Sequence, residues 1–149
     1  MKSLEFESRA KRKRAAGCVF FCPSTKRFCL ALRGLREVSY PNHWSTWGGG
    51  KDPGETSEET VLREIGEEAG YYGEIDLVPM LTNITDHSVY FNFLGVVPEE
   101  FEPKMNWENS EYKWVRYGHW PKPLHPGVVE LLADEDSAEL MQQYAGIDK

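Results

Sequence analysis

Long hydrophobic runs are absent from this sequence of 149 residues, and no stretch approaches the ~20 apolar residues that a membrane-spanning helix needs. The charged N-terminal stretch, residues 1–17, also lacks the apolar segment of a secretory signal. We therefore expect neither a membrane partner nor export from the cell.

Cysteine is scarce. The three cysteines, Cys18, Cys22 and Cys29, are odd in number and lie in strand-like surroundings. A zinc site would need a fourth ligand at a suitable spacing, and the sequence offers none. We expect free, buried thiols of the kind found in reducing compartments. The sequence thus predicts a cytoplasmic protein.

Positive charge is also in deficit, because 17 Lys and Arg face 24 Asp and Glu, for a net charge of −7. This balance argues against general nucleic-acid binding. The exception is the basic run Lys11–Arg14. It could contact nucleic acid or direct localisation, or it could simply be a solvated lead-in to the first strand.

The length fits one domain over residues 1–149, with residues 1–13 as a polar lead-in. Short apolar runs predict strands over residues 15–22, 27–33, 47–50, 75–83, 87–97 and 111–116. Helices are predicted between a cap at Thr56 or Ser57 and Gly70, and from residue 127 onward with a break near residues 134–136. This order favours an α/β fold in which helices flank a mixed sheet.

The most informative stretch is residues 49–71, GGKDPGETSEETVLREIGEEAGY. Helical spacing should bring the carboxylates of Glu64, Glu67 and Glu68 onto one patch, where like charges repel by roughly 0.2–0.5 kcal/mol per pair. A hard divalent cation would remove this repulsion, because Mg²⁺ prefers carboxylate and carbonyl oxygens. The residues expected to face the core from the opposite side are Val61, Leu62, Ile65 and Ala69.

The fixed positions of this stretch match the Nudix box, G-x5-E-x7-R-E-U-x-E-E-x-G-U, in which U is a bulky apolar residue. Gly49, Glu55 and the run Arg63–Tyr71 occupy these positions, with an aromatic residue at the last of them. The chain therefore resembles Nudix hydrolases. The resemblance implies an α/β/α sandwich and hydrolysis of the pyrophosphate bond in a nucleoside diphosphate linked to another moiety.

The resemblance also implies roles for individual residues. Glu64, Glu67 and Glu68 would bind Mg²⁺ or Mn²⁺, together with the backbone carbonyl of Gly49. Two ions could then clamp the attacking and leaving oxygens. Arg63 belongs to the same catalytic motif. We expect its side chain to project away from the carboxylate patch, within reach of Glu59 or Glu67. Its expected partner is Glu55, so that it holds the loop to the helix and does not contact the substrate.

The general base is open at this stage. Inside the motif the candidate is Glu64. Outside it the candidates are Glu108, which is also a candidate metal ligand, and Glu111. Either of these last two residues could instead be an ordinary surface acid.

Two residues outside the motif are candidates for substrate binding. Arg33 could bind a phosphate, or it could be solvated at the end of its strand. Trp44 could stack on a base, or it could pack within the core or a loop.

The expected substrate is a small nucleotide, a nucleotide sugar or a dinucleoside polyphosphate. The alternative is a non-catalytic nucleotide-binding module of the same fold, but such proteins usually lose acids that this sequence keeps. An isoprenyl diphosphate isomerase would need a cysteine near its substrate, and the cysteines here lie in early apolar strands. The sequence does not specify the substrate, the number of metal ions or the oligomeric state. A homodimer is one of the states that it allows.

Overall fold

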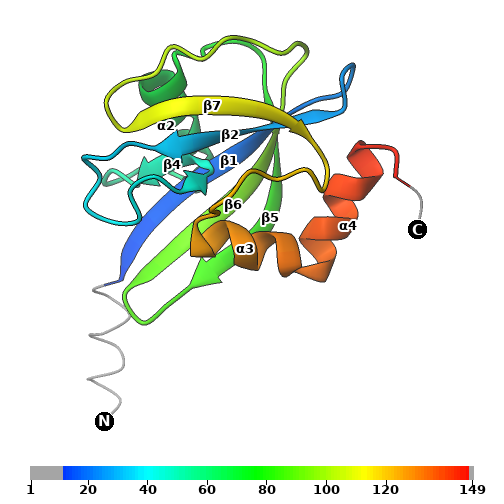
Figure 1. Ribbon diagram of the computed structural model, residues 1–149. Helices are drawn as coiled ribbons and strands as arrows, with labels where there is room; N and C mark the ends of the chain where they lie inside the picture. The colour runs from blue at the N-terminus through cyan, green and yellow to red at the C-terminus, as the bar shows by residue number, and fades with distance from the viewer. Residues whose placement is uncertain (1–11, 148–149) are drawn as a thin grey trace.

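The computed structural model describes residues 12–147. Within them, helices lie on both faces of one mixed sheet, which confirms the predicted α/β fold (Figure 1). The strands are β1 Lys13–Cys22, β2 Arg27–Arg33, β3 Trp44–Ser45, β4 Trp47–Gly50, β5 Asp76–Ile84, β6 Ser88–Val96 and β7 Asn109–Arg116. The helices are α2 Ser57–Ala69, α3 Pro126–Ala133 and α4 Glu135–Tyr144, and the predicted break falls at Asp134.

Strand β1 is the centre of the sheet. Its first half pairs with β4 and its second half with β2, while β6 runs parallel along its other side. The remaining strands extend the sheet, with β3 and β7 beside β2 and β5 beside β6. β1 begins two residues earlier than predicted, because Lys13 and Arg14 pair with Ser88 and Val89 of β6. The rest of the predicted lead-in, residues 1–11, lies outside the described residues.

Two hydrophobic cores lie on opposite faces of the sheet, because successive side chains of a strand alternate between faces. Ala16, Cys18 and Phe20 of β1 pack toward α2 in the first core. Val19 and Phe21 pack toward α3 and α4 in the second. Cys18, Cys22 and Cys29 are buried and free, as predicted. No helix within residues 12–147 is long and apolar enough to cross a membrane.

Helix α2 begins and ends where local chemistry predicts. The Thr56 side chain accepts from the N–H of Glu59, whose own side chain accepts from the N–H of Thr56. Gly70 ends the helix at φ 65°, a left-handed conformation that glycine adopts without strain. One prediction for the helix is wrong: Leu62 is 47% exposed. The stripe at positions 61, 64, 65, 68 and 69 is buried, and position 62 falls outside this stripe.

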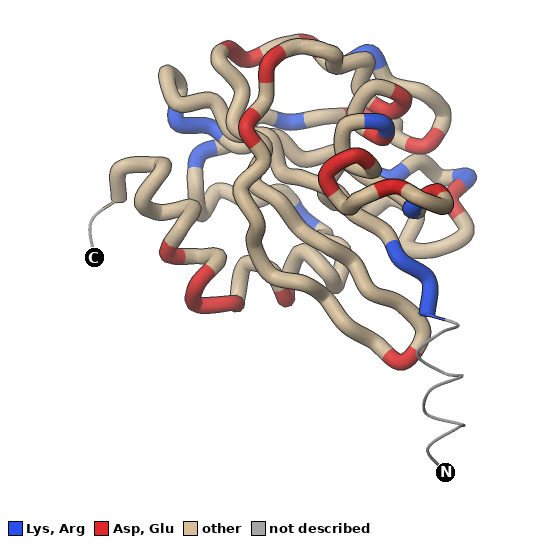
Figure 2. Tube along the Cα trace, turned by 180° about the vertical axis from the view of Figure 1, so that it is seen from behind, with Lys and Arg blue, Asp and Glu red and all other residues tan. Residues whose placement is uncertain are grey.

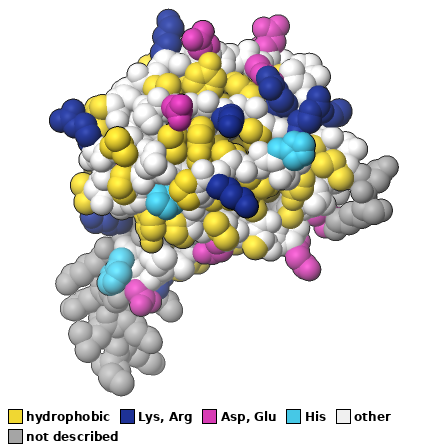
Figure 3. Space-filling view, in the orientation of Figure 1, with side chains coloured by type: hydrophobic (Ala, Val, Ile, Leu, Met, Phe, Trp, Pro, Cys, Tyr) yellow, Lys and Arg dark blue, Asp and Glu magenta, His cyan; other side chains and the backbone are white. Residues whose placement is uncertain are grey.

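The two faces of the molecule carry different side chains. Seen from behind, acidic residues follow α2 and the loops next to it (Figure 2). On the face with α3 and α4, hydrophobic side chains gather in the middle, with lysine and arginine side chains among and around them (Figure 3). The acidic site predicted from the sequence therefore lies on the α2 face.

The first turn of α3 contains a pH-sensitive cap. The Nδ1 atom of His125 accepts from the N–H of Gly127 at 2.9 Å, which requires that this nitrogen carry no proton. Burial, with the nearby charges of Arg33 and His43, lowers the pKa of His125 to about 4. Unfolded histidine binds its proton near pH 6.5, so the free energy of unfolding should fall as the pH drops from about 6.5 to 4.

We expect the substitution His125→Asn to reduce this acid sensitivity, because asparagine caps a helix without titrating. Between pH 7 and pH 5, the variant should lose less stability than the wild type, by about 1–2 kcal/mol, because each unit of pKa difference is worth about 1.4 kcal/mol. Urea unfolding at the two pH values measures this difference. Equal losses in the two proteins would contradict the prediction.

Candidate active site

Two carboxylates lie side by side on the inward face of α2. Glu64 and Glu68 are one helical turn apart, and they are only 7% and 3% exposed. The end of β4 lies directly against them. A side chain on Gly49 would place its Cβ only 2.7 Å from the Glu64 carboxyl group, so this close approach requires glycine.

Glu68 has an unusual environment for a carboxyl group. Its Oε1 accepts from Asn109 Nδ2 at 2.9 Å, whereas its buried Oε2 has no hydrogen-bond partner among the described residues. Burial raises the pKa of Glu68 to about 9, and Glu64 and Glu108 act in the same direction. An ionised carboxylate is costly in such a place unless a cation accompanies it. The free Oε2 beside a second carboxylate therefore fits a divalent metal ion.

Glu67 does not join this pair, which corrects the prediction that three carboxylates converge. Its side chain is 53% exposed and turns toward Arg63, with Nη1 and Oε2 3.4 Å apart. Within the described residues, no three His, Cys, Asp or Glu side chains already surround a metal position. Like charges repel, and a guanidinium on the same helix offers Glu67 a nearby counter-charge. Glu67 thus lies at the rim of the site.

Arg63 joins the preceding loop to the helix. Its Nε lies 2.8 Å from Glu55 Oε2 and its Nη2 donates to the Gly50 carbonyl at 2.7 Å. The predicted partner is therefore present, and this contact lowers the pKa of Glu55 to about 2. The expectation that Arg63 points away from the patch is wrong, because its Nη1 reaches Glu64 Oε1 at 3.0 Å. Arg63 thereby orients one of the two buried carboxylates.

Removing this guanidinium should affect stability as well as rate. For Arg63→Ala we expect a loss of about 1–3 kcal/mol in the free energy of unfolding, since several charged hydrogen bonds disappear and the buried Glu64 carboxylate loses its counter-charge. Arg63→Lys should recover part of the loss. Urea unfolding and kcat, measured on the same preparations, test this. A raised KM with unchanged stability would instead indicate a phosphate contact.

The loop before β7 reaches the carboxylates. Asn106 Nδ2 donates to the Glu67 carbonyl at 3.2 Å, and its Oδ1 accepts from the Glu108 N–H at 2.9 Å. Burial and the charge of Glu64 raise the pKa of Glu108. Asn109, the next residue, holds Glu68 as described above. The structure therefore brings Glu108 to the site. It also adds Asn109, which belongs to no sequence motif and was not among the predicted site residues.

Glu111 is not brought to the site. It pairs with Leu32, whose side chain belongs to the second core, while its neighbour Tyr112 packs against the first core on the α2 side. Alternation along β7 therefore points Glu111 toward the opposite face of the sheet. This geometry argues against the catalytic role that the sequence analysis considered for it.

The two candidate substrate-binding residues have structural partners. Arg33 pairs with Glu37 at 2.7 Å and its Nε donates to the Ser39 carbonyl at 2.9 Å, so it holds its own loop together. Trp44 is 8% exposed and packs in the second core. Its ring has little free surface on which a base could stack.

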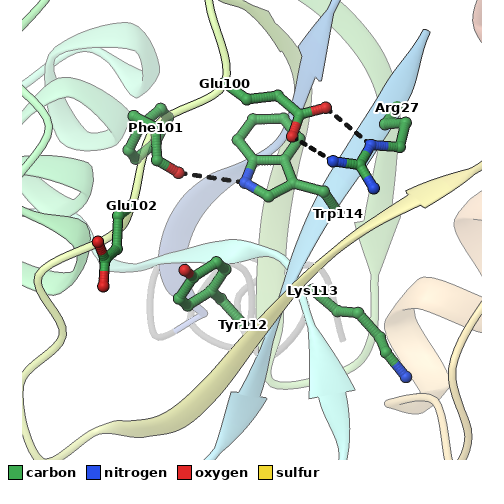
Figure 4. A pocket seen from close by; sticks show the side chains of 7 residues that line it. All are labelled: Arg27, Glu100, Phe101, Glu102, Tyr112, Lys113 and Trp114. Atoms are coloured by element: carbon green, nitrogen blue, oxygen red, sulfur yellow. Dashed lines mark hydrogen bonds and ion pairs between the residues drawn. The ribbon is translucent and has the colours of Figure 1, made fainter. Parts of the chain in front are cut away.

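A surface cavity lies elsewhere, between β7 and the loop that precedes it (Figure 4). Its volume is about 530 Å³, and its lining residues are Arg27, Glu100, Phe101, Glu102, Tyr112, Lys113 and Trp114. Two contacts hold its wall: Arg27 Nε donates to Glu100 at 2.8 Å, and Trp114 Nε1 donates to the Phe101 carbonyl at 3.2 Å. The buried carboxylates of α2 are not part of this cavity.

Comparison with known proteins identifies the family of this chain. The NUDIX domain family model matches residues 11–134. An uncharacterized Nudix hydrolase of Rhodococcus erythropolis is 54% identical over 37 residues, which cover 25% of this chain and 20% of that protein. The chain thus spans only a fifth of that relative's length. The mouse diphosphoinositol polyphosphate phosphohydrolase 3-alpha is 28% identical over 134 residues, which cover 80% of this chain and 77% of the mouse protein.

Solved structures agree on the fold. A binary complex of the Caenorhabditis elegans Ap4A hydrolase superposes with a TM-score of 0.63 at 18% identity, over 90% of this chain and 96% of that one. An identity this low supports the architecture alone, with a mixed sheet between helices.

Proposed function

The chain belongs to the Nudix hydrolase family, and we propose that it cleaves the pyrophosphate bond of a small nucleotide derivative with Mg²⁺ or Mn²⁺ bound at Glu64 and Glu68. The observation that carries this proposal is the buried Glu68 Oε2, which has no partner in the described chain and lies beside a second carboxylate. The substrate would be a nucleotide, a nucleotide sugar or a dinucleoside polyphosphate.

The residues of the site would divide the work. Glu64, Glu68 and the Gly49 carbonyl would hold the metal, and Glu67 would contribute from the rim. Bound metal would neutralise phosphate charge and make the attacking water more acidic. Arg63 and Asn109 would keep the two buried carboxylates in position. Glu64 or Glu108 would accept the proton of the attacking water.

A non-catalytic nucleotide-binding module is the alternative. It would have no need to keep two adjacent carboxylates buried at an energetic cost, nor the arginine and asparagine that orient them. These features favour an enzyme. A cytoplasmic location and the oligomeric state stay predictions.

A hydrolysis screen, with the nucleotide products separated by chromatography, tests the proposal. The protein would be incubated with nucleoside triphosphates, nucleotide sugars and dinucleoside polyphosphates, in Mg²⁺, in Mn²⁺ and in chelator. We expect turnover only with metal. The same ions should raise the melting temperature, since an ion at 100 times its Kd stabilises the fold by about 2.7 kcal/mol. Full activity in chelator, with no metal-dependent shift in melting temperature, would refute the metal site.

A further inference from the structure

The basic run that begins β1 has no role in the site described so far. Its described residues are Arg12, Lys13 and Arg14, and the last two are exposed. The Nε of Arg12 is buried without a hydrogen-bond partner in the described chain. In a protein with a net charge of −7, such a cluster calls for an explanation.

The fold brings this run to the end of β4. The Lys51 N–H donates to the Arg14 carbonyl at 2.9 Å, directly after the pairs Ala15–Gly50 and Ala16–Gly49 of the β1–β4 ladder. Arg14 and Lys51 are therefore cross-strand neighbours. Arg14 lies two residues beyond Ala16, and Lys51 lies two residues beyond Gly49. Each step is roughly 7 Å along the strand.

Both side chains should project on the α2 face. Arg14 alternates with Ala16 and Cys18, which pack toward α2. Lys51 continues the alternation of Trp47, which packs in the same core, and Gly49, which lies against Glu64. The two cations thus lie next along the β1–β4 ladder from Gly49, which approaches Glu64.

Neither cation is neutralised within residues 12–147. No acidic side chain there forms an ion pair with Arg14 or Lys51, whereas Arg27, Arg33 and Arg63 are each paired with a glutamate. Elsewhere the rim of the site is acidic, with Glu67 and Glu108 next to the buried pair. A polyanionic substrate would therefore be repelled by these glutamates and attracted by the unpaired cations of this basic edge.

We propose that Arg14 and Lys51 bind phosphate groups beyond the scissile pyrophosphate, so that the substrate carries three or more consecutive phosphates. The proposal rests on the pyrophosphatase function above and narrows its substrate class. Metal held by Glu64 and Glu68 would serve the two phosphates that flank the scissile bond. The Arg14 guanidinium and the Lys51 ammonium group lie a few ångströms further along the strands. They match a phosphate chain that continues beyond these two phosphates. A nucleoside diphosphate sugar has no phosphate to place there.

The first test is binding, without metal or turnover. Inorganic tripolyphosphate and inorganic pyrophosphate are titrated calorimetrically into the protein in chelator. We expect wild type to prefer tripolyphosphate, and Arg14→Gln and Lys51→Gln each to weaken its binding by about 10-fold, the loss of one charged hydrogen bond. Arg116→Gln is the matched control. Arg116 pairs with Arg27, which pairs with Cys22 at the opposite end of β1 from Arg14. Equal tripolyphosphate affinity in all four proteins, or an equal loss in the control, would overturn the proposal.

The second test is activity, and it separates this proposal from the first. With Mg²⁺, Arg14→Gln and Lys51→Gln should lower kcat/KM for ATP by about 10-fold through KM, and change kcat/KM for ADP-glucose by less than 2-fold. An unchanged ratio of the two kcat/KM values would count against the basic edge even in an active enzyme. If no compound is turned over while the binding differences appear, the pyrophosphatase function fails and the polyphosphate-binding edge stands.

Discussion

Replacing Glu68 by glutamine should lower kcat by about 100-fold or more, because the substitution removes a charge that the proposed metal ion would need. Glutamine keeps the shape of the side chain, and its Oε1 can still accept from Asn109, as Glu68 Oε1 does at 2.9 Å. The melting temperature without metal should therefore stay the same or rise slightly. The stabilisation by Mg²⁺ should be lost.

The measurements are kcat at saturating Mg²⁺ and melting curves with and without the ion. Glu58→Gln is the matched control, because Glu58 is an exposed residue in the first turn of the same helix. It should keep nearly wild-type turnover and the metal-dependent shift. Wild-type kcat in Glu68→Gln would remove this residue from the active site.

The second large effect concerns the general base. We expect Glu64→Gln to lower kcat by about 100-fold, Glu108→Gln by less than about 10-fold, and Glu111→Gln hardly at all. Glu64 lies beside Glu68 and Gly49, and Glu108 lies at the edge of the carboxylate cluster. Glu111 points to the other face of the sheet. Glu111→Gln thus serves as the control for a charge change on β7.

A pH–rate profile at saturating Mg²⁺ distinguishes the two remaining candidates. The acidic limb of the profile reports protonation of the base, and it should disappear only in the variant that lacks this base. Burial and the charge of Glu64 raise the pKa of Glu108, so a base at this position would place the limb above the usual range for glutamate. A loss of kcat in Glu108→Gln as large as in Glu64→Gln, with KM unchanged, would assign the role to Glu108.

Features that depend on neighbours in the chain could be predicted from the sequence. The cap at Thr56, the end of α2 at Gly70 and the break at Asp134 all depend on hydrogen bonds within a few residues. The box residues are likewise close in sequence, so their helical placement followed from their spacing. Buried cysteines followed from the apolar runs that contain them.

Features that depend on partners from distant segments required the tertiary structure. Helical spacing puts Glu64, Glu67 and Glu68 near one another, but contact with β4 and β7 buries only Glu64 and Glu68. Asn109 lies 41 residues from Glu68 along the chain, and no local pattern indicates their contact. Burial and electrostatic environment depend on three-dimensional neighbours, whereas spacing along one helix determines only which side chains share a face.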